Sequence, residues 1–171
     1  MSEGFKAPEI RPSKCTCSLF VCFPFLLQWL SPPEAIEHFK SQEIQFAPPQ
    51  FYELCRLCNF SSLQELHKFS SERALEGCER WMPVILTASD GYMQLLPGDE
   101  LYPEDPDYTG EKKITLSIDK KIEDLMKEGS IFHRIVRKNN DLAVYVNVQA
   151  KYKHINPVMI NSNNSDFNSR L

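Results

Sequence analysis

The sequence predicts an α+β fold in which three helices precede two β-hairpins, with a short helix between the hairpins. Three observations support this prediction. Helix-start signals recur in the first half, the apolar period then changes from 3.6 to 2 residues, and two turn sequences separate alternating apolar runs. The 171 residues are 42% hydrophobic, which is enough for one core and indicates a single domain.

Each of the three predicted helices begins at a recognisable cap. Ser-Pro-Pro-Glu at 31–34 combines a capping box with an early proline and predicts a helix from Pro32 to about Gln42. Ala-Pro-Pro predicts a second helix over 47–58, and a capping box at 62–65 predicts a third that ends near Leu75. Three apolar side chains of this third helix are expected to face inward: Leu63, Leu66 and Phe69.

The second half of the chain alternates apolar and polar residues between turn signals. Two hairpins are predicted, one from residues 84–87 and 92–96 around Asp90-Gly91, the other from 131–137 and 142–148 across Asn139-Asn140-Asp141. Residues 118–127 predict the short helix between them, closed by Gly129.

Residues 1–28 differ from the rest and form a separate N-terminal segment in this prediction. The apolar run 18–27 is interrupted by Pro24 and is shorter than the ~20 residues of a membrane-spanning helix. No small-residue cleavage site follows it, as a signal peptide would require. Two alternatives remain for this run: a buried edge strand, or a segment foreign to the fold.

Charge and cysteine content exclude several classes of protein. The net charge of −4 and pI near 5.6 argue against nucleic-acid and membrane-surface binding. Among the six cysteines, Cys55 and Cys58 continue an apolar helical stripe with Phe51 and Leu54, which favours core thiols over zinc ligands. A zinc protein built on the cysteines is the alternative.

Few polar residues are candidates for catalysis or for binding a metal or phosphate. His38 and His67 are expected to be solvated, and the acid pairs Asp99-Glu100 and Glu104-Asp105 are expected to be solvated rather than to hold a cation. His133 and His154 lie in or beside the second hairpin. Three residues are weak candidates for contacts to phosphate, although an exposed strand end is the simpler interpretation: Lys151, Lys153 and His154.

The last three residues, Ser169-Arg170-Leu171, are similar to the Ser-Lys-Leu address that the peroxisomal import receptor reads. Turn-forming residues precede them, so residues 161–171 are predicted to be a flexible tail that presents the address. The predicted location is the peroxisome, and the import receptor is a predicted partner.

Several segments resemble one known family. They are Trp29–Ile36, Phe46–Glu53, Leu95–Tyr102, Lys127–Gly129, Phe132–Val136 and Lys151–His154. Together they are similar to the C-terminal half of the peroxisomal acyl-coenzyme A diphosphatases, a branch of the Nudix hydrolases. The resemblance implies that residues 29–160 form part of a Nudix-like domain, and that Trp29–Ile36 is the strand-to-helix junction closing its core sheet.

The same resemblance implies a hydrolase that cleaves acyl-coenzyme A to acyl-phosphopantetheine and adenosine 3′,5′-bisphosphate, with Mg²⁺ or Mn²⁺ held by the glutamates of a Nudix box. No Arg-Glu-x-x-Glu-Glu occurs in these 171 residues, and Glu72-Arg73 and Glu79-Arg80 have the reverse order. No catalytic residue or metal ligand is therefore assigned, and this truncated form is predicted to be inactive alone. The alternative is a non-catalytic peroxisomal binding or interaction module.

Overall fold

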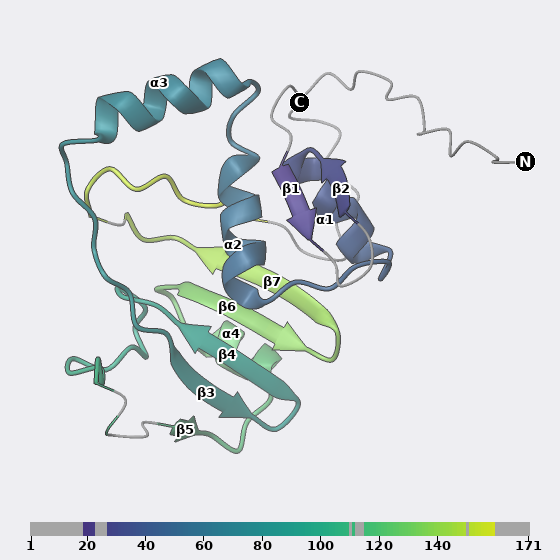
Figure 1. Cartoon of the computed structure of the whole chain (residues 1–171). Coiled ribbons are helices and arrows are strands. Elements are labelled where there is room, and N and C mark those ends of the chain that lie inside the picture. The colour runs from purple at the N-terminus through teal and green to yellow at the C-terminus, as the bar shows by residue number, and fades with distance from the viewer. Residues whose placement is uncertain (1–18, 23–26, 110, 112–114, 150, 160–171) are drawn as a thin grey trace, which may run out of the picture.

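A computed structural model of the chain describes residues 19–22, 27–109, 111, 115–149 and 151–159 (Figure 1). The predicted α+β class is confirmed, with helices before two hairpins and a short helix between the hairpins. The elements are β1 (Leu19–Cys22), β2 (Leu27–Leu30), α1 (Pro32–Lys40), α2 (Pro48–Leu57), α3 (Leu63–Arg73), β3 (Val84–Ala88), β4 (Gly91–Leu95), β5 (Thr115–Ser117), α4 (Ile122–Glu128), β6 (His133–Lys138) and β7 (Asp141–Val146).

The main sheet has five strands in the order β5-β3-β4-β6-β7. All neighbours are antiparallel except β5, which runs parallel to β3. β1 and β2 pair with each other in a separate two-stranded sheet. The edge strand expected within residues 18–27 is present in its described part, as β1 and the start of β2, but in this small sheet. The strand-to-helix junction at 29–36 is present, but it does not close the main sheet.

Local sequence signals explain where α1 and α2 begin. The Glu34 carboxylate accepts hydrogen bonds from the Ser31 N–H and hydroxyl, at 2.8 and 2.6 Å, and these bonds lower the pKa of Glu34. At the start of α2, the Gln50 side-chain oxygen accepts from the Ala47 N–H at 3.0 Å. Both helices have proline in the first turn, where no hydrogen bond is lost. α1 ends at Lys40, two residues before the predicted end.

α3 differs from its prediction. None of its residues is buried; Leu63 is exposed, while Leu66 and Phe69 are only half-buried. Phe69 packs on Phe60, with ring centroids 5.2 Å apart, and Figure 1 shows α3 standing apart from the sheet. The expectation that these three side chains face a core is wrong because no element of the sheet reaches this helix.

The hairpin turns also shift slightly. Ala88 pairs with Gly91, so the first turn is Ser89-Asp90 and Gly91 is already in β4. A side chain at Gly91 would meet the backbone carbonyl of Arg137 and, at 2.8 Å, the Cδ1 of Ile122. Close approach of neighbouring backbone, rather than turn geometry, therefore requires glycine there. The second turn is Asn139-Asn140, and Asn139 has a positive φ of 55°.

The segment predicted as a helix over 118–127 begins differently. Residues 115–117 form β5, and the Ile118 N–H donates to the Thr87 carbonyl at 3.0 Å. α4 starts only at Ile122, whose N–H donates to the Asp90 carboxylate at 2.8 Å. Its end at Glu128, followed by Gly129, agrees with the prediction. Three residues are too short for an alternating pattern to reveal β5.

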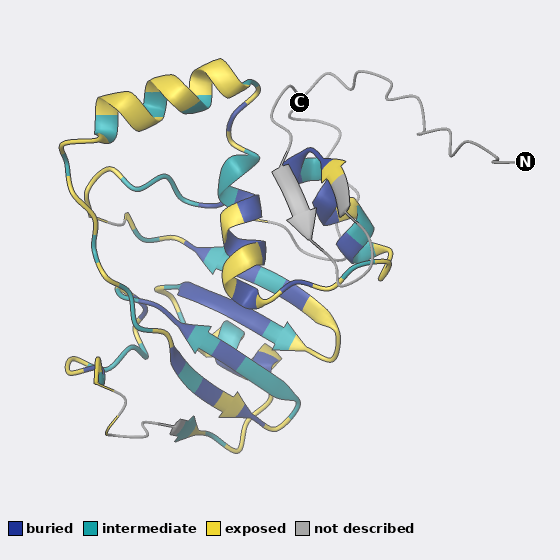
Figure 2. Cartoon of the chain, in the orientation of Figure 1, coloured by how far each residue is buried: buried dark blue, intermediate teal, exposed yellow. Residues whose placement is uncertain are grey.

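Each face of the sheet carries its own core, and Figure 2 shows β6 between them as an almost continuously buried strand. α1 and α2 cover β7 and the start of β6, where Leu142, Val144 and Ile135 are buried. α4 covers the opposite face across β3 and β4. Residues that are consecutive in β6 thus face different cores, which positions the polar groups described next.

Candidate functional site

The start of β6 carries two fully buried polar residues. His133 and Arg134 are both 0% exposed. Because they are consecutive in a strand, they point to opposite faces of the sheet. Arg134 joins an acidic turn at residues 97–101, whereas His133 joins an aromatic cluster beneath α2.

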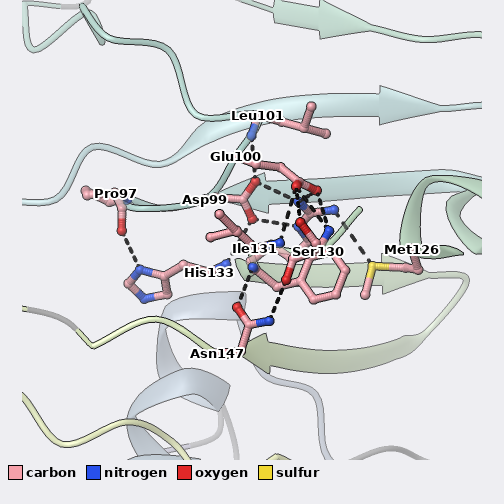
Figure 3. A network of polar contacts seen from close by, with 11 residues as sticks. Pro97, Asp99, Glu100, Leu101, Met126, Ser130, Ile131, His133 and Asn147 are labelled. Atoms are coloured by element: carbon pink, nitrogen blue, oxygen red, sulfur yellow. Dashed lines mark hydrogen bonds and ion pairs between the residues drawn. The ribbon is translucent and has the colours of Figure 1, made fainter. Parts of the chain in front are cut away.

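Arg134 forms a buried, two-pronged ion pair with Asp99. Figure 3 shows Asp99 within the surrounding network, beside Glu100 and Ser130. The Arg134 Nε donates to Asp99 Oδ2 at 2.6 Å and an Nη donates to Oδ1 at 2.7 Å. The carboxylate also accepts the N–H groups of His133 and Leu101, at 2.9 and 3.0 Å. The guanidinium lies 4.5 Å from the centre of the Phe132 ring. Every acceptor position of Asp99 is therefore used, which is the condition for a stable buried charge.

Glu100 and Asn147 extend this network to the chain before β6. The Glu100 carboxylate accepts the N–H groups of Ser130 and Ile131, at 3.1 and 3.2 Å. Although desolvation acts to raise it, these bonds and the Arg134 charge hold the pKa of Glu100 below its ordinary value. The Asn147 side chain accepts from the Phe132 N–H and donates to the Ser130 carbonyl.

The expectation that Asp99-Glu100 is a solvated acid pair is therefore wrong for Asp99, whereas Glu100 is exposed. Asp99 is 5% exposed, and both carboxylates are committed to Arg134 or to backbone N–H groups. Glu104 and Asp105 are exposed, as predicted. In the described part of the chain, no three His, Cys, Asp or Glu side chains lie close enough to hold a metal ion.

On the other face, the ring of Tyr52 contacts the rings of three other residues. We call the four residues the Tyr52 cluster: Tyr52, Trp81, His133 and His154. His133 Nδ1 lies 2.6 Å from the Pro97 carbonyl, so it must carry the proton. Its Nε2 then accepts from the Tyr52 hydroxyl at 3.0 Å, and His154 Nε2 lies 3.4 Å from the same hydroxyl. Trp81 contacts both imidazoles, with centroids at 4.8 and 4.6 Å.

Burial sets the protonation of this cluster. Desolvation lowers the pKa of His133, and desolvation together with the charges of Arg56 and Arg73 lowers the pKa of His154 to about 4. Desolvation also raises the pKa of Tyr52. All three groups are neutral at pH 7, so the cluster forms hydrogen bonds through neutral groups and holds no charge.

The three candidates for phosphate contacts lie together in the loop after β7. Lys151 Nζ lies 2.9 Å from Glu79, and Lys153 forms an ion pair with Glu76. Both ammonium groups are exposed, while His154 is half-buried and turns inward to Tyr52. The structure thus brings the three together, with each lysine against a carboxylate.

Other predicted residues are placed as follows. Cys55, on α2, is fully buried in the core shared with α1, which confirms the core-thiol interpretation. Burial raises the pKa of its thiol. Cys58 packs half-buried beside that core. His67 is exposed, whereas His38 Nδ1 lies 2.6 Å from Glu43. Ser169, Arg170 and Leu171 lie outside the described residues.

Sequence reasoning missed Tyr52, Trp81, Glu76 and Glu79. The only available signal was Tyr52 on the apolar side of a predicted helix, which is equally typical of core packing. The other three lie in a segment without secondary structure, where no pattern indicates which side chains meet. The described residues contain no helix that is long and apolar enough to cross a membrane.

We expect Asp99→Asn to lower the free energy of unfolding by about 3 to 5 kcal/mol, because it leaves the buried Arg134 charge without its counter-ion. Urea denaturation measures this loss. Asp119→Asn, at an exposed position, is the control and should change stability by less than about 0.5 kcal/mol. A loss below about 1 kcal/mol for Asp99→Asn would contradict a buried ion pair.

We expect the Tyr52 cluster to weaken on acidification. The folded pKa of His154, about 4, lies below its ordinary value of 6.5, so its contribution is present above about pH 6.5 and is lost as the pH falls toward 4. His154→Gln removes this titration and should reduce the drop in urea midpoint between about pH 7.5 and pH 5. His67→Gln, at an exposed site, should keep the wild-type drop. An unchanged drop in His154→Gln would contradict this assignment.

A family model described as the NUDT19 C-terminal domain matches residues 85–147. This span contains most of the main sheet, α4 and the Asp99–Arg134 pair. No solved structure was found to match the chain.

Three curated proteins, each named acyl-coenzyme A diphosphatase NUDT19, match most of the chain. The protein of Gallus gallus is 80% identical over 144 residues, which are 84% of this chain and 38% of that protein. Those of Xenopus laevis and Homo sapiens are 53% and 56% identical, covering 79% and 76% of this chain and 36% and 34% of theirs. The chain therefore spans less than two fifths of the length of these relatives. In sequence, it corresponds to the C-terminal part of the NUDT19 family of acyl-coenzyme A diphosphatases.

Proposed function

We propose that this chain supplies the C-terminal part of a peroxisomal acyl-coenzyme A diphosphatase and that it hydrolyses no acyl-coenzyme A by itself. The observation that carries the first part is the 80% identity to a relative named for that activity. The reaction of the whole enzyme would yield acyl-phosphopantetheine and adenosine 3′,5′-bisphosphate. The described domain would contribute a sheet in which the turn after β4, at residues 97–101, is fixed by Arg134.

The second part of the proposal is supported by the residues that are present. The resemblance to Nudix hydrolases implies Mg²⁺ or Mn²⁺, which take carboxylate and other oxygen ligands. Asp99 and Glu100, the acids of the turn after β4, are already committed to Arg134 and to backbone N–H groups. The described residues do not fit such a metal, and no step through one is derived.

The purified chain is therefore expected to release no adenosine 3′,5′-bisphosphate from an acyl-coenzyme A in the presence of Mg²⁺ or Mn²⁺. A full-length relative assayed in parallel is the positive control, and urea denaturation shows that the chain is folded. Release that a chelator abolishes would contradict the proposal, because it would require a metal-binding set of carboxylates within these residues.

The peroxisomal part rests on Ser169-Arg170-Leu171, which resembles the address read by the import receptor. Deleting these three residues is expected to move a fluorescently tagged chain from peroxisomal puncta to the cytosol. The tag must be N-terminal so that the terminal carboxylate stays free. Arg170→Lys is the control and should keep the puncta, since Lys is the residue of the reference address. Puncta that persist after the deletion would contradict this part.

A second candidate function is that of a non-catalytic peroxisomal interaction module. The observation that favours it is α3, which buries no residue and leaves Leu63 45% exposed. An isolated helix of this length is marginal in water, so a partner that covers it would stabilise it. Chelator-sensitive hydrolysis in the assay above would exclude this alternative.

A further inference from the structure

The chain after β7 divides into two parts that are held differently. Residues 155–158 are bound to the region of α2 through backbone groups. The Arg56 Nε donates to the Ile155 carbonyl at 3.1 Å, and the Val158 N–H donates to the Cys55 carbonyl at 3.1 Å. The Asn59 side chain donates to the Asn156 carbonyl at 3.0 Å. This part is firmly attached.

Residues 151–154, which we call the strap, are held by surface charges at Lys151 and Lys153 and by the ring contacts of His154 described above. Lys151 pairs with Glu79 and Lys153 with Glu76, and the two lysine side chains are 72% and 71% exposed. The Arg73 Nε donates to the Tyr152 carbonyl at 3.0 Å. In Figure 1 the turn of this loop lies beside the segment that descends from α3. Exposed ion pairs are weak and are screened by salt, so these contacts hold the strap loosely.

Two residues of the strap have an unfavourable backbone conformation. Tyr152 and Lys153 have φ values of 57° and 51°, the left-handed region that costs free energy for any residue with a Cβ atom. Two such residues in succession persist only where surrounding contacts hold them. The strap therefore balances a conformational cost against weak ionic contacts.

The strap covers the Tyr52 cluster. Its last residue, His154, packs against Trp81 with the rings tilted by 55° and their centroids 4.6 Å apart, and it reaches the Tyr52 hydroxyl. Trp81 is itself joined to the strap through Glu79, whose carboxylate accepts from the Trp81 Nε1 at 3.2 Å and from Lys151. Movement of the strap about residues 155–158 would expose Trp81 and the Tyr52–His133 pair.

We propose that Lys151 and Lys153 exchange the carboxylates of Glu79 and Glu76 for the phosphate groups of a ligand, and that this exchange opens the strap and uncovers the Tyr52 cluster. A phosphate group carries more negative charge than a carboxylate and offers three acceptor oxygens, so it competes effectively for an ammonium group. Lys151 and Lys153 offer two exposed ammonium groups one residue apart in the same loop, so a ligand with two linked phosphates can engage both.

Inorganic pyrophosphate is the probe, and Trp81 is the reporter. The chain has two tryptophans, and Trp29 is 63% exposed, so Trp29→Phe leaves Trp81 as the only source of tryptophan fluorescence. Pyrophosphate is expected to increase quenching of Trp81 by acrylamide more than sodium chloride does at equal ionic strength. No hydrolysis is measured, so the result is independent of the proposed function.

Substitutions on each side of the ion pairs, made in the Trp29→Phe chain, separate the roles. Glu76→Gln alone leaves the Lys151–Glu79 pair in place and should lower the midpoint concentration of pyrophosphate by about 1.4- to 5-fold, the range for one exposed ion pair. Lys151→Gln with Lys153→Gln should give high quenching without pyrophosphate and no further response. Glu123→Gln with Lys127→Gln removes an exposed pair on α4 and should behave like the parent.

Each variant is first shown to unfold cooperatively in urea, so that high quenching means an open strap and not an unfolded chain. The proposal is overturned if pyrophosphate and sodium chloride act equally, which would indicate general screening of charge. It is also overturned if the response survives Lys151→Gln with Lys153→Gln, because the anion would then bind elsewhere.

Discussion

The ion pair between Asp99 and Arg134 is the interaction on which the rest of the domain depends. Both side chains are removed from water, and a charge in that position is tolerated only when its partner and hydrogen bonds are complete. Asp99 also accepts two backbone N–H groups, so one carboxylate ties the turn after β4 to the start of β6. Those two strands are central in the sheet, and the cores on both faces are therefore set by the same contact.

The register of β6 gives the domain two polar sites of opposite character. Arg134 turns to the face covered by α4, where its counter-ion Asp99 is buried with it. His133 turns to the face covered by α2 and is neutral because burial lowers its pKa. A shift by one residue would exchange these environments, placing a guanidinium among aromatic rings. The register is thus specified by charge as well as by the pattern of apolar residues.

Much of the fold followed from local signals, because caps and turns act over four residues or fewer. Ser31 and Glu34 fixed the start of α1, and the asparagines at 139–140 fixed the second turn. The buried partners could not be predicted, because Asp99 and Arg134 are far apart in sequence and each is typical of a surface residue. The Tyr52 cluster could not be predicted for the same reason, since its rings come from α2, two loops and β6. The sequence also gave no sign that α3 would lack a core to cover.

The parallel pairing of β5 with β3 has a consequence for the order of assembly. The two hairpins close across two-residue turns, which form within microseconds. β5 joins β3 by matching Ile85 with Thr115, a pairing that must wait for a long loop to close. It contributes three residues and has β3 as its only neighbour in the sheet. The sheet is therefore expected to grow outward from its hairpins, with β5 the last strand to dock and the first whose amide protons exchange with solvent.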